Sequence, residues 1–331
     1  MKVRYLVLLG AAVGIVALLA CFGLREKAPV VGDSTRFENP PQVPVFPQAS
    51  GTVTRALAPS SLGARDASAR LGTPAPSSED VAAVIDAAGE SLEARLAALG
   101  RLGRRLSAAD VESLLGFLDR RDGEDALPPE RLNALKNDVA NLLRRQAVFP
   151  ESLVGGLSAM WRNPGHDEVW RDYCIQHLGA SWNRVVDPAV RVGLGETLWA
   201  ASGDASLPGA GTALIALRNL AEAGDEERAN VADRAFACAA AAESPEGVRV
   251  TALQVASGLG HADVVPFARS LLTDRRQPVH LRMSAIAALG ASGDASDLPA
   301  LKALAASSEP RLRAAASAAI KRLDPVKAGQ E

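Results

Sequence analysis

From Ser78 onward, apolar residues recur at three- and four-residue intervals within short segments of about ten to sixteen residues, which is typical of amphipathic helices. Gly, Pro, Asp or Asn separates one segment from the next. Ser107-Ala-Ala-Asp110 has the spacing of a capping box. Asp187-Pro188, Ser244-Pro245 and Glu309-Pro310 place a proline where the first turn of a helix tolerates it. The pattern predicts about fourteen helices and almost no strand.

The hexapeptide ASGDAS occurs twice, at Ala201–Ser206 and Ala291–Ser296, and Leu-Pro follows each copy within three residues. Glycine commonly ends a helix, and Asp or Ser commonly caps the next one. We therefore expect each copy to form the elbow of a helical hairpin. In this interpretation Gly203 and Gly293 end one helix, while Asp204 and Asp294 open the other.

A five-residue sequence that begins with arginine also recurs along the chain, and we call it the arginine phrase. Residues three and four positions after an arginine lie on its side of a helix, so each phrase places a small Ala beside a branched aliphatic residue. The Ala permits a neighbouring helix to approach closely. The copies are Arg95-Leu-Ala-Ala-Leu99, Arg131-Leu-Asn-Ala-Leu135, Arg249-Val-Thr-Ala-Leu253 and Arg282-Met-Ser-Ala-Ile286, with a degenerate copy beginning at Arg313.

These repeats resemble the HEAT-like repeats, particularly the variety first associated with phycobilisome lyase subunits. The resemblance is clearest over Glu246–Leu323, where Val248-Arg249, Leu281-Arg282 and Leu312-Arg313 each begin an Ala-rich helix. It implies an all-α fold, an α-solenoid of about seven stacked helical hairpins over residues 78–325. It also implies that the repeated arginines pair with acidic residues of adjacent repeats, for which Asp187, Asp263 and Asp294 are candidates.

The first 24 residues differ from the rest of the chain. Lys2 and Arg4 precede an uncharged stretch from Tyr5 to Leu24, which is long enough to cross a bilayer as a helix. The more positive amino-terminal side is expected to stay in the cytoplasm, so the body of the protein would be extracytoplasmic, on the periplasmic side of a bacterial membrane. Leu18-Leu19-Ala20-Cys21 resembles a bacterial lipobox, in which Cys21 would be lipidated, although Leu19 departs from the preferred residues. A signal anchor, a lipoprotein and a cleaved signal peptide all remain open.

Residues 25–77 contain eight prolines among Ser, Gly, Ala and Thr and have no sustained apolar period. Such a composition buries too little surface to offset chain entropy, so we expect a disordered linker. A proline-rich docking motif at Pro40-Pro41-Gln42-Val43-Pro44 is the functional alternative. Residues 326–331 are expected to be a tail.

Composition and motifs argue against an enzyme. Apolar residues make up 48% of the chain and aromatic residues only 4%, which suits an Ala- and Leu-rich helical core. No phosphate-binding glycine loop, His-Glu-x-x-His, Gly-x-Ser-x-Gly or Cys-x-x-Cys occurs. We therefore expect no catalytic residues, no metal and no cofactor. Apart from Cys21, the cysteines are Cys174 and Cys238, which are expected to pack in the core, with a disulfide between them as the alternative.

The most unusual window is Trp161–Trp182, which holds three of the four tryptophans. Trp170, Tyr173 and His177 follow one another at helical spacing, the pattern of a buried stripe. Trp, Tyr and Arg are also favoured as interface anchors, so an exposed patch is the alternative. The candidate partner-binding residues are Trp161, Trp170, Tyr173, His177 and Trp182.

Charge disfavours nucleic acid as a partner. The chain has 36 Lys and Arg and 38 Asp and Glu, of which eight and four precede Ser78, so the remainder has a net charge of −6. Phosphate backbones require a basic face. The favoured function is a non-enzymatic scaffold tethered to the membrane, binding a protein or peptide of the cell envelope. The alternatives are a bilin lyase or isomerase or a chaperone of the lyase-type family and, less favoured, a DNA-binding solenoid resembling the alkylation-repeat proteins.

Overall fold

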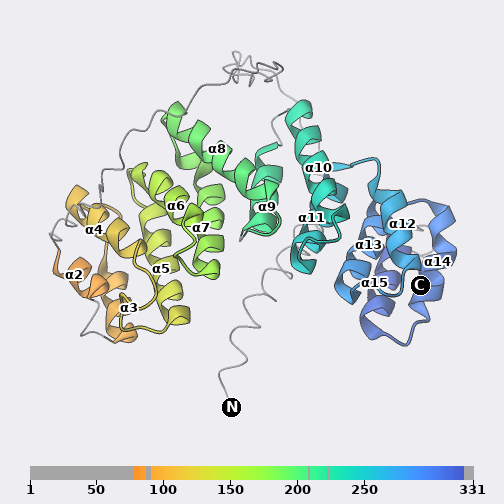
Figure 1. The fold of residues 1–331 in the computed structure, drawn as a ribbon, viewed down its shortest axis with the longest axis horizontal. Coiled ribbons are helices and arrows are strands. Elements are labelled where there is room, and N and C mark those ends of the chain that lie inside the picture. Colours follow the sequence, from red (N-terminus) through yellow and green to blue (C-terminus); the bar gives the residue numbers. More distant parts are fainter. Residues whose placement is uncertain (1–77, 87–90, 208, 222–223, 324–331) are drawn as a thin grey trace, which may run out of the picture. The chain divides into compact units, whose positions relative to one another are not determined.

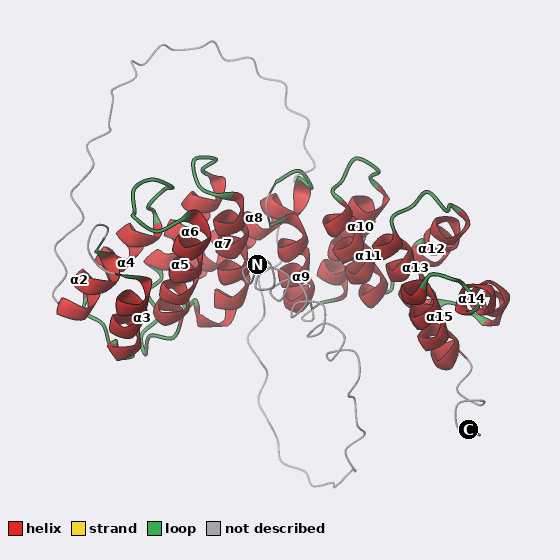
Figure 2. Ribbon diagram, turned by 90° about the horizontal axis from the view of Figure 1, so that it is seen from below, coloured by secondary structure: helices red, strands yellow, loops and turns green. Residues whose placement is uncertain are grey.

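The computed structural model describes residues 78–323 except 87–90, 208 and 222–223, and all of these lie in one compact unit, Ser68–Glu331. The predicted anchor, linker and tail, with Cys21, lie outside the described residues, as do Asp324 and Pro325. The described part contains fourteen α-helices and no strand (Figure 2). They are α2 (Glu79–Ile85), α3 (Leu92–Arg101), α4 (Ala108–Leu118), α5 (Pro129–Arg144), α6 (Ser152–Arg162), α7 (Glu168–Ser181), α8 (Pro188–Gly203), α9 (Ala210–Leu220), α10 (Asp225–Ala240), α11 (Glu246–Leu259), α12 (Val264–Thr273), α13 (Val279–Ser292), α14 (Leu298–Ala305) and α15 (Pro310–Leu323).

The fourteen helices pair in chain order into seven hairpins, from α2 with α3 to α14 with α15 (Figure 1). The second helices of the hairpins form a continuous row, because α3, α5, α7, α9, α11, α13 and α15 each contact the next member. Among the first helices, α2 contacts α4 and α6 contacts α8. This arrangement is an α-solenoid, which confirms the predicted fold class.

Several helices begin at the predicted residues because polar side chains cap them. The hydroxyl of Ser107 accepts a hydrogen bond from the N–H of Asp110, and the carboxylate of Asp187 accepts one from the N–H of Ala189. Pro188 occupies the first turn of α8, as expected. Local capping chemistry therefore fixes where these helices start.

The two ASGDAS copies do not form the same elbow. In the second copy, Asp294 caps a short 3-10 helix (Ala295–Asp297) that leads directly into α14, and Asp297 completes a capping box by accepting the N–H of Asp294 at 3.0 Å. In the first copy the residue corresponding to Asp297 is Leu207. Asp204 therefore forms only a local turn with Ser206, and α9 begins later, at Ala210. The expectation that Asp204 opens a helix was wrong because the reciprocal carboxylate is missing.

Small residues allow the second helices to pack closely. Gly290 of α13 lies against Ala319 of α15, and a Cβ atom on Gly290 would be 2.8 Å from the Cα of Ala319. Ile286, Leu301 and Leu312 complete the apolar cluster between α13, α14 and α15. In the repeated arginine sequences, Ala98, Ala252 and Ala285 are buried as expected, whereas Ala134 of the copy that begins at Arg131 is exposed.

The predicted arginine pairing is found at Arg95, which pairs with Asp125 of the next hairpin at 2.8 Å. Among the described ion pairs, none joins a repeated arginine to Asp187, Asp263 or Asp294. Asp294 pairs with Arg269 of α12, at 3.1 Å, and Asp187 caps its own helix. A second contact recurs more often. The Nε atoms of Arg95, Arg249 and Arg171, the last of which lies outside the repeated copies, donate to main-chain carbonyls in the last turn of the preceding helix, namely Val84, Ala239 and Trp161, at 2.8, 3.1 and 2.7 Å. The last carbonyls of a helix have no partner within the helix, so an arginine near the start of the next helix can satisfy them.

Candidate binding groove

An open groove of about 520 Å³ crosses the amino-terminal ends of α7, α9 and α11, which are neighbours in the continuous row of second helices. Three elements meet there, together with the segment that joins α8 to α9. The lining residues are Glu168, Val169 and Asp172 of α7, Ala205–Leu207 and Gly209 of the connection, Ala210–Thr212 and Ile215 of α9, and Pro245, Gly247, Val248 and Thr251 at and within α11.

Glycines shape the floor of this groove. Gly209 has a φ angle of +88°, in the left-handed region that favours glycine. A Cβ atom on Gly209 would be 2.7 Å from Cγ1 of Ile175, so a side chain there would push α9 away from α7. A Cβ atom on Gly211 would be 3.5 Å from Thr251, at ordinary contact distance. The groove therefore depends on the close approach of α9 to α7.

The charged residues that line the groove are both acidic: Glu168 is exposed, and Asp172 is largely covered by its neighbours. The hydroxyl of Thr212 donates a hydrogen bond to the Asp172 carboxylate, with an oxygen–oxygen distance of 2.7 Å. Burial raises the pKa of Asp172, and the bond from Thr212 offsets only part of this effect. An ammonium or guanidinium group entering the groove would stabilise the ionised carboxylate.

Apolar surface adjoins these carboxylates. Val169, one turn before Tyr173 on α7, is 53% exposed and lines the groove. Leu207, Ile215 and Val248 contribute further aliphatic lining. The groove thus combines a small apolar floor with two negative charges, which suits an aliphatic side chain that ends in a positive charge.

The aromatic window does not form a surface patch. Trp161, Trp170 and His177 are buried, and Tyr173 and Trp182 are half-buried and pack against the core. His177 lies between α7 and α5, where its Nε2 is 3.1 Å from Oδ1 of Asn137 and its Nδ1 is 3.4 Å from Nη1 of Arg144. We therefore do not place the binding surface on these five residues.

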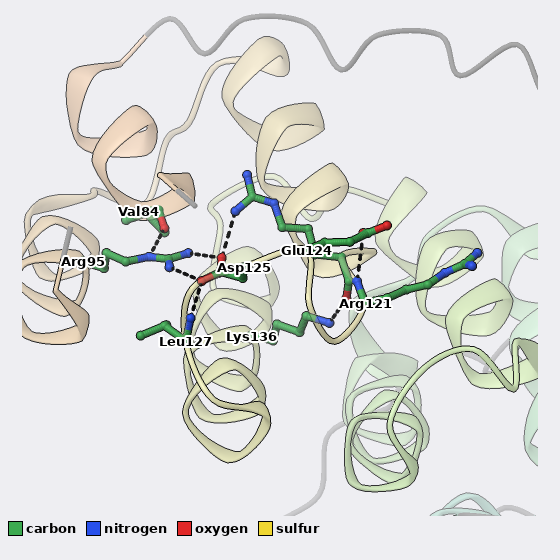
Figure 3. A network of polar contacts seen from close by, with 8 residues as sticks. Val84, Arg95, Arg121, Glu124, Asp125, Leu127 and Lys136 are labelled. Carbon is green, nitrogen blue, oxygen red and sulfur yellow. Dashed lines mark hydrogen bonds and ion pairs between the residues drawn. The ribbon is translucent and has the colours of Figure 1, made fainter. Parts of the chain in front are cut away.

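A buried polar network lies near the start of the solenoid (Figure 3). Arg95 of α3 pairs with Asp125, which also accepts hydrogen bonds from Arg120 and from the N–H of Leu127. Lys136 of α5 donates to the carbonyl of Arg120, and its Nζ lies 5.1 Å from the centroid of the Trp170 ring. Burial lowers the pKa of Lys136 to about 8. Because Arg95, Asp125 and Lys136 are almost completely covered, the network fastens the α4–α5 loop and is not accessible to a partner.

Cys174 and Cys238 are free and buried, which excludes the disulfide alternative. Burial raises the pKa of both thiols.

Within residues 78–323, apart from the gaps given above, no three His, Cys, Asp or Glu side chains are grouped so that they could hold a metal ion. The same residues include no helix that is both long and apolar enough to cross a bilayer.

Sequence reasoning missed the groove residues Glu168, Asp172 and Thr212. Asp172 and Thr212 are 40 positions apart and meet only because α7 and α9 are adjacent. No local signal sets Glu168 and Asp172 apart, because pairs of acidic residues are common on solvated helices.

The family match agrees with this architecture. Residues 234–321 match the family described as HEAT repeats. A search of curated proteins found no match. The chain is similar to the structure of human deoxyhypusine hydroxylase in complex with glycerol, with 19% identity and a TM-score of 0.31, over 74% of this chain and 95% of that chain. Residues 234–321 therefore resemble HEAT repeats, and the described residues before them have the same architecture of paired helices stacked in chain order.

Proposed function

We propose that this protein is a non-enzymatic interaction scaffold whose groove across α7, α9 and α11 binds a partner segment carrying a lysine or arginine. The observation that carries the proposal is the position of Asp172, a desolvated carboxylate with one short hydrogen bond, in the wall of an open groove. A cationic side chain supplies the charge that the groove itself lacks. The repeated helices hold the wall in place before the partner arrives, which reduces the entropy lost on binding.

The partner test uses the full chain in detergent and a fluorescent peptide with two lysines among alanines. Fluorescence anisotropy would report binding, and a peptide with glutamine in place of both lysines is the first control. Asp172→Asn keeps the size of the side chain and removes its charge. We expect it to weaken lysine-peptide binding by about thirtyfold or more, because it leaves a desolvated cation unpaired. Asp233→Asn, at an exposed carboxylate on α10 outside the groove, should leave the affinity unchanged.

Two results would contradict this assignment. One is equal affinity for the lysine and glutamine peptides. The other is equal weakening by Asp172→Asn and Asp233→Asn, since this would show that the overall negative charge of the solenoid attracts the peptide.

The natural partner can then be located in cells with a photocrosslinker at Val169. The matched control position is Gln176, which is exposed on α7 outside the groove.

We further propose that the amino-terminal segment tethers the scaffold to the extracytoplasmic face of a bacterial membrane. The proposal is supported by the uncharged stretch Tyr5–Leu24 and by the bias of positive charge towards Met1. The test compares the mass and membrane partition of the chain with those of Cys21→Ser. A loss of membrane association in the variant indicates lipidation, and unchanged association indicates an anchor. A chain that is soluble in both forms would contradict the tether.

A further inference from the structure

Three consecutive connecting segments are joined side by side at the carboxyl-terminal ends of α3, α5 and α7. They include residues 102–107, 145–150 and 182–187. The N–H of Ala147 donates to the carbonyl of Arg104 at 2.7 Å, and Nε of Arg104 donates to the carbonyl of Arg145 at 3.0 Å. Nη2 of Arg184 donates to the carbonyl of Gln146 at 2.6 Å. The three segments therefore form one continuous edge of the solenoid.

Five arginines gather on this edge, which we call the arginine edge: Arg104, Arg105, Arg144, Arg145 and Arg184. None of them forms an ion pair with an acidic residue in the part of the chain that the structure describes. Arg104, Arg144 and Arg184 donate to main-chain carbonyls, which orients each guanidinium. Arg104 uses only its Nε in this way and keeps further N–H groups for a ligand, whereas the Nε of Arg144 is buried. Arg105 and Arg145 are exposed.

The arginines also repel one another. Burial lowers the pKa of Arg144, and the positive charges of Arg145 and Arg184 lower it further. An anion placed on the edge would relieve this repulsion and accept hydrogen bonds from several guanidinium groups at once. Guanidinium groups match the geometry of phosphate oxygens particularly well.

Three acidic residues lie near this edge, and two of them, Glu151 and Asp187, accept hydrogen bonds from main-chain N–H groups. Glu151 accepts hydrogen bonds from the N–H groups of Val186 and Asp187, at 2.6 and 2.9 Å. Asp187 accepts the N–H of Ala189 at 2.7 Å. Asp138 lies on α5, and burial raises its pKa although Arg145 opposes this effect. These three carboxyl groups are fewer than the five arginines, so a positive excess remains on the surface.

Two aliphatic side chains project from the same segments. Val148 is 85% exposed and Val186 is 83% exposed. Each lies within three positions of an arginine of its segment, so the edge presents apolar groups among cations. Apolar side chains among basic residues are typical of surfaces that rest in the interfacial region of an anionic bilayer.

The described chain enters the solenoid at this edge. Asp80, in the first turn of α2, pairs with Arg101 at the end of α3, with an N–O distance of 2.6 Å. The N–H of Ser78 donates to Asp110 at the start of α4, at 3.1 Å. Residues 102–107 join α3 to α4, so the point where the amino-terminal segment attaches lies beside the arginine edge.

We propose that the arginine edge is a lipid-facing surface that binds the headgroups of anionic phospholipids. This inference rests on the proposed membrane tether. A tether of residues 25–77 raises the local concentration of the bilayer, so a weak electrostatic contact is sufficient. The contact would hold the solenoid in one orientation on the membrane, with α3, α5 and α7 ending at the lipid.

The test uses the full chain in nanodiscs of phosphatidylcholine alone and in nanodiscs with phosphatidylglycerol added. Hydrogen–deuterium exchange of residues 102–107, 145–150 and 182–187 reports whether the edge is covered. We expect exchange in these segments to slow by about tenfold in the anionic discs, since each arginine near an anionic surface strengthens association by about fivefold. The protection should disappear in about 1 M salt, where charges are screened within about 3 Å.

Arg105→Glu combined with Arg145→Glu should abolish the protection. Both side chains are exposed, so the fold should persist. The control is Arg275→Glu combined with Arg276→Glu, which makes the same change of charge at an exposed pair in the α12–α13 loop and should leave the protection intact.

Equal exchange in the two kinds of disc would overturn the lipid-facing surface while leaving the tether in place. A chain that enters neither disc would contradict the tether and the inference together. If poly-glutamate protects the three segments and phosphatidylglycerol does not, the arginine edge binds an acidic polypeptide and the lipid assignment is wrong.

Discussion

The guanidinium of Arg95 makes two hydrogen bonds with the carboxylate of Asp125, at 2.8 and 3.0 Å, and both side chains are buried. The pair joins α3 to the loop that connects α4 and α5. Burial opposes the ionisation of Asp125, but hydrogen bonds from Arg95, from the N–H of Leu127 and from Arg120 outweigh it and hold the pKa of the carboxyl below its usual range. Arg95, the first residue of a repeated sequence, therefore forms a polar contact with the α4–α5 loop, in addition to the apolar contacts that the repeat was expected to make.

Replacing Asp125 with Ala should destabilise the protein by about 3–5 kcal/mol, because the buried guanidinium of Arg95 would lose its partner. Urea unfolding followed by circular dichroism would measure the loss. Asp80→Ala breaks the more exposed pair with Arg101 and should cost less than about 1 kcal/mol. Similar losses in the two variants would show that burial does not govern the strength of these pairs.

Lys136 should make stability rise with pH in alkaline solution. Burial lowers its pKa to about 8, so between this value and about 10.4 the unfolded chain holds a proton that the folded chain has released. Lys136→Met removes the buried charge and should stabilise the protein at pH 7 by about 2 kcal/mol. The gain should shrink as the pH approaches about 10. Unfolding free energies of the two proteins at about pH 7 and about pH 9.5 test this, and a constant difference would contradict it.

His177 should make stability fall in acid. Burial and the nearby charge of Arg144 lower its pKa to about 4, so between this value and about 6.5 the unfolded chain binds a proton that the folded chain does not. The contribution of neutral His177 to the free energy of unfolding is fully present above about pH 6.5. The free energy of unfolding should be lower by about 2 kcal/mol at about pH 5. His177→Gln retains hydrogen-bonding groups towards Asn137 and Arg144 and should remove this loss of stability in acid. An unchanged pH dependence in the variant would place the acid sensitivity elsewhere.

Two glycine substitutions should have opposite effects. Gly290→Ala places a methyl group 2.8 Å from Ala319, so α13 and α15 must separate and stability should fall by about 1–3 kcal/mol. Gly155→Ala, in α6, meets nothing within 4 Å and should raise stability by about 0.5–1 kcal/mol through helix propensity. Thermal unfolding of both variants would measure these two changes in stability. A gain at Gly290 would show that the contact between α13 and α15 adapts without cost.

The sequence predicted the helices well where their ends depend on nearby residues. Ser107, Asp187 and Pro188 occupy the expected positions at helix starts, and the second ASGDAS copy forms the expected elbow. The first copy differs because one residue, Leu207, stands where the capping box requires an acid. Even there, the difference is local and can be recognised once the two copies are aligned.

The sequence alone determined the all-helical class, the division into seven hairpins and the small residues at helix contacts, because hydrogen bonds within a helix and its caps join residues a few positions apart. Only the tertiary structure decided that Asp172 meets Thr212 in a groove, that Arg95 meets Asp125, and that three arginine-bearing segments form one edge. These contacts span 30 to 41 positions. They depend on how far each hairpin is rotated against its neighbour, which is set by the fit of all buried side chains together and not by any short stretch of the chain.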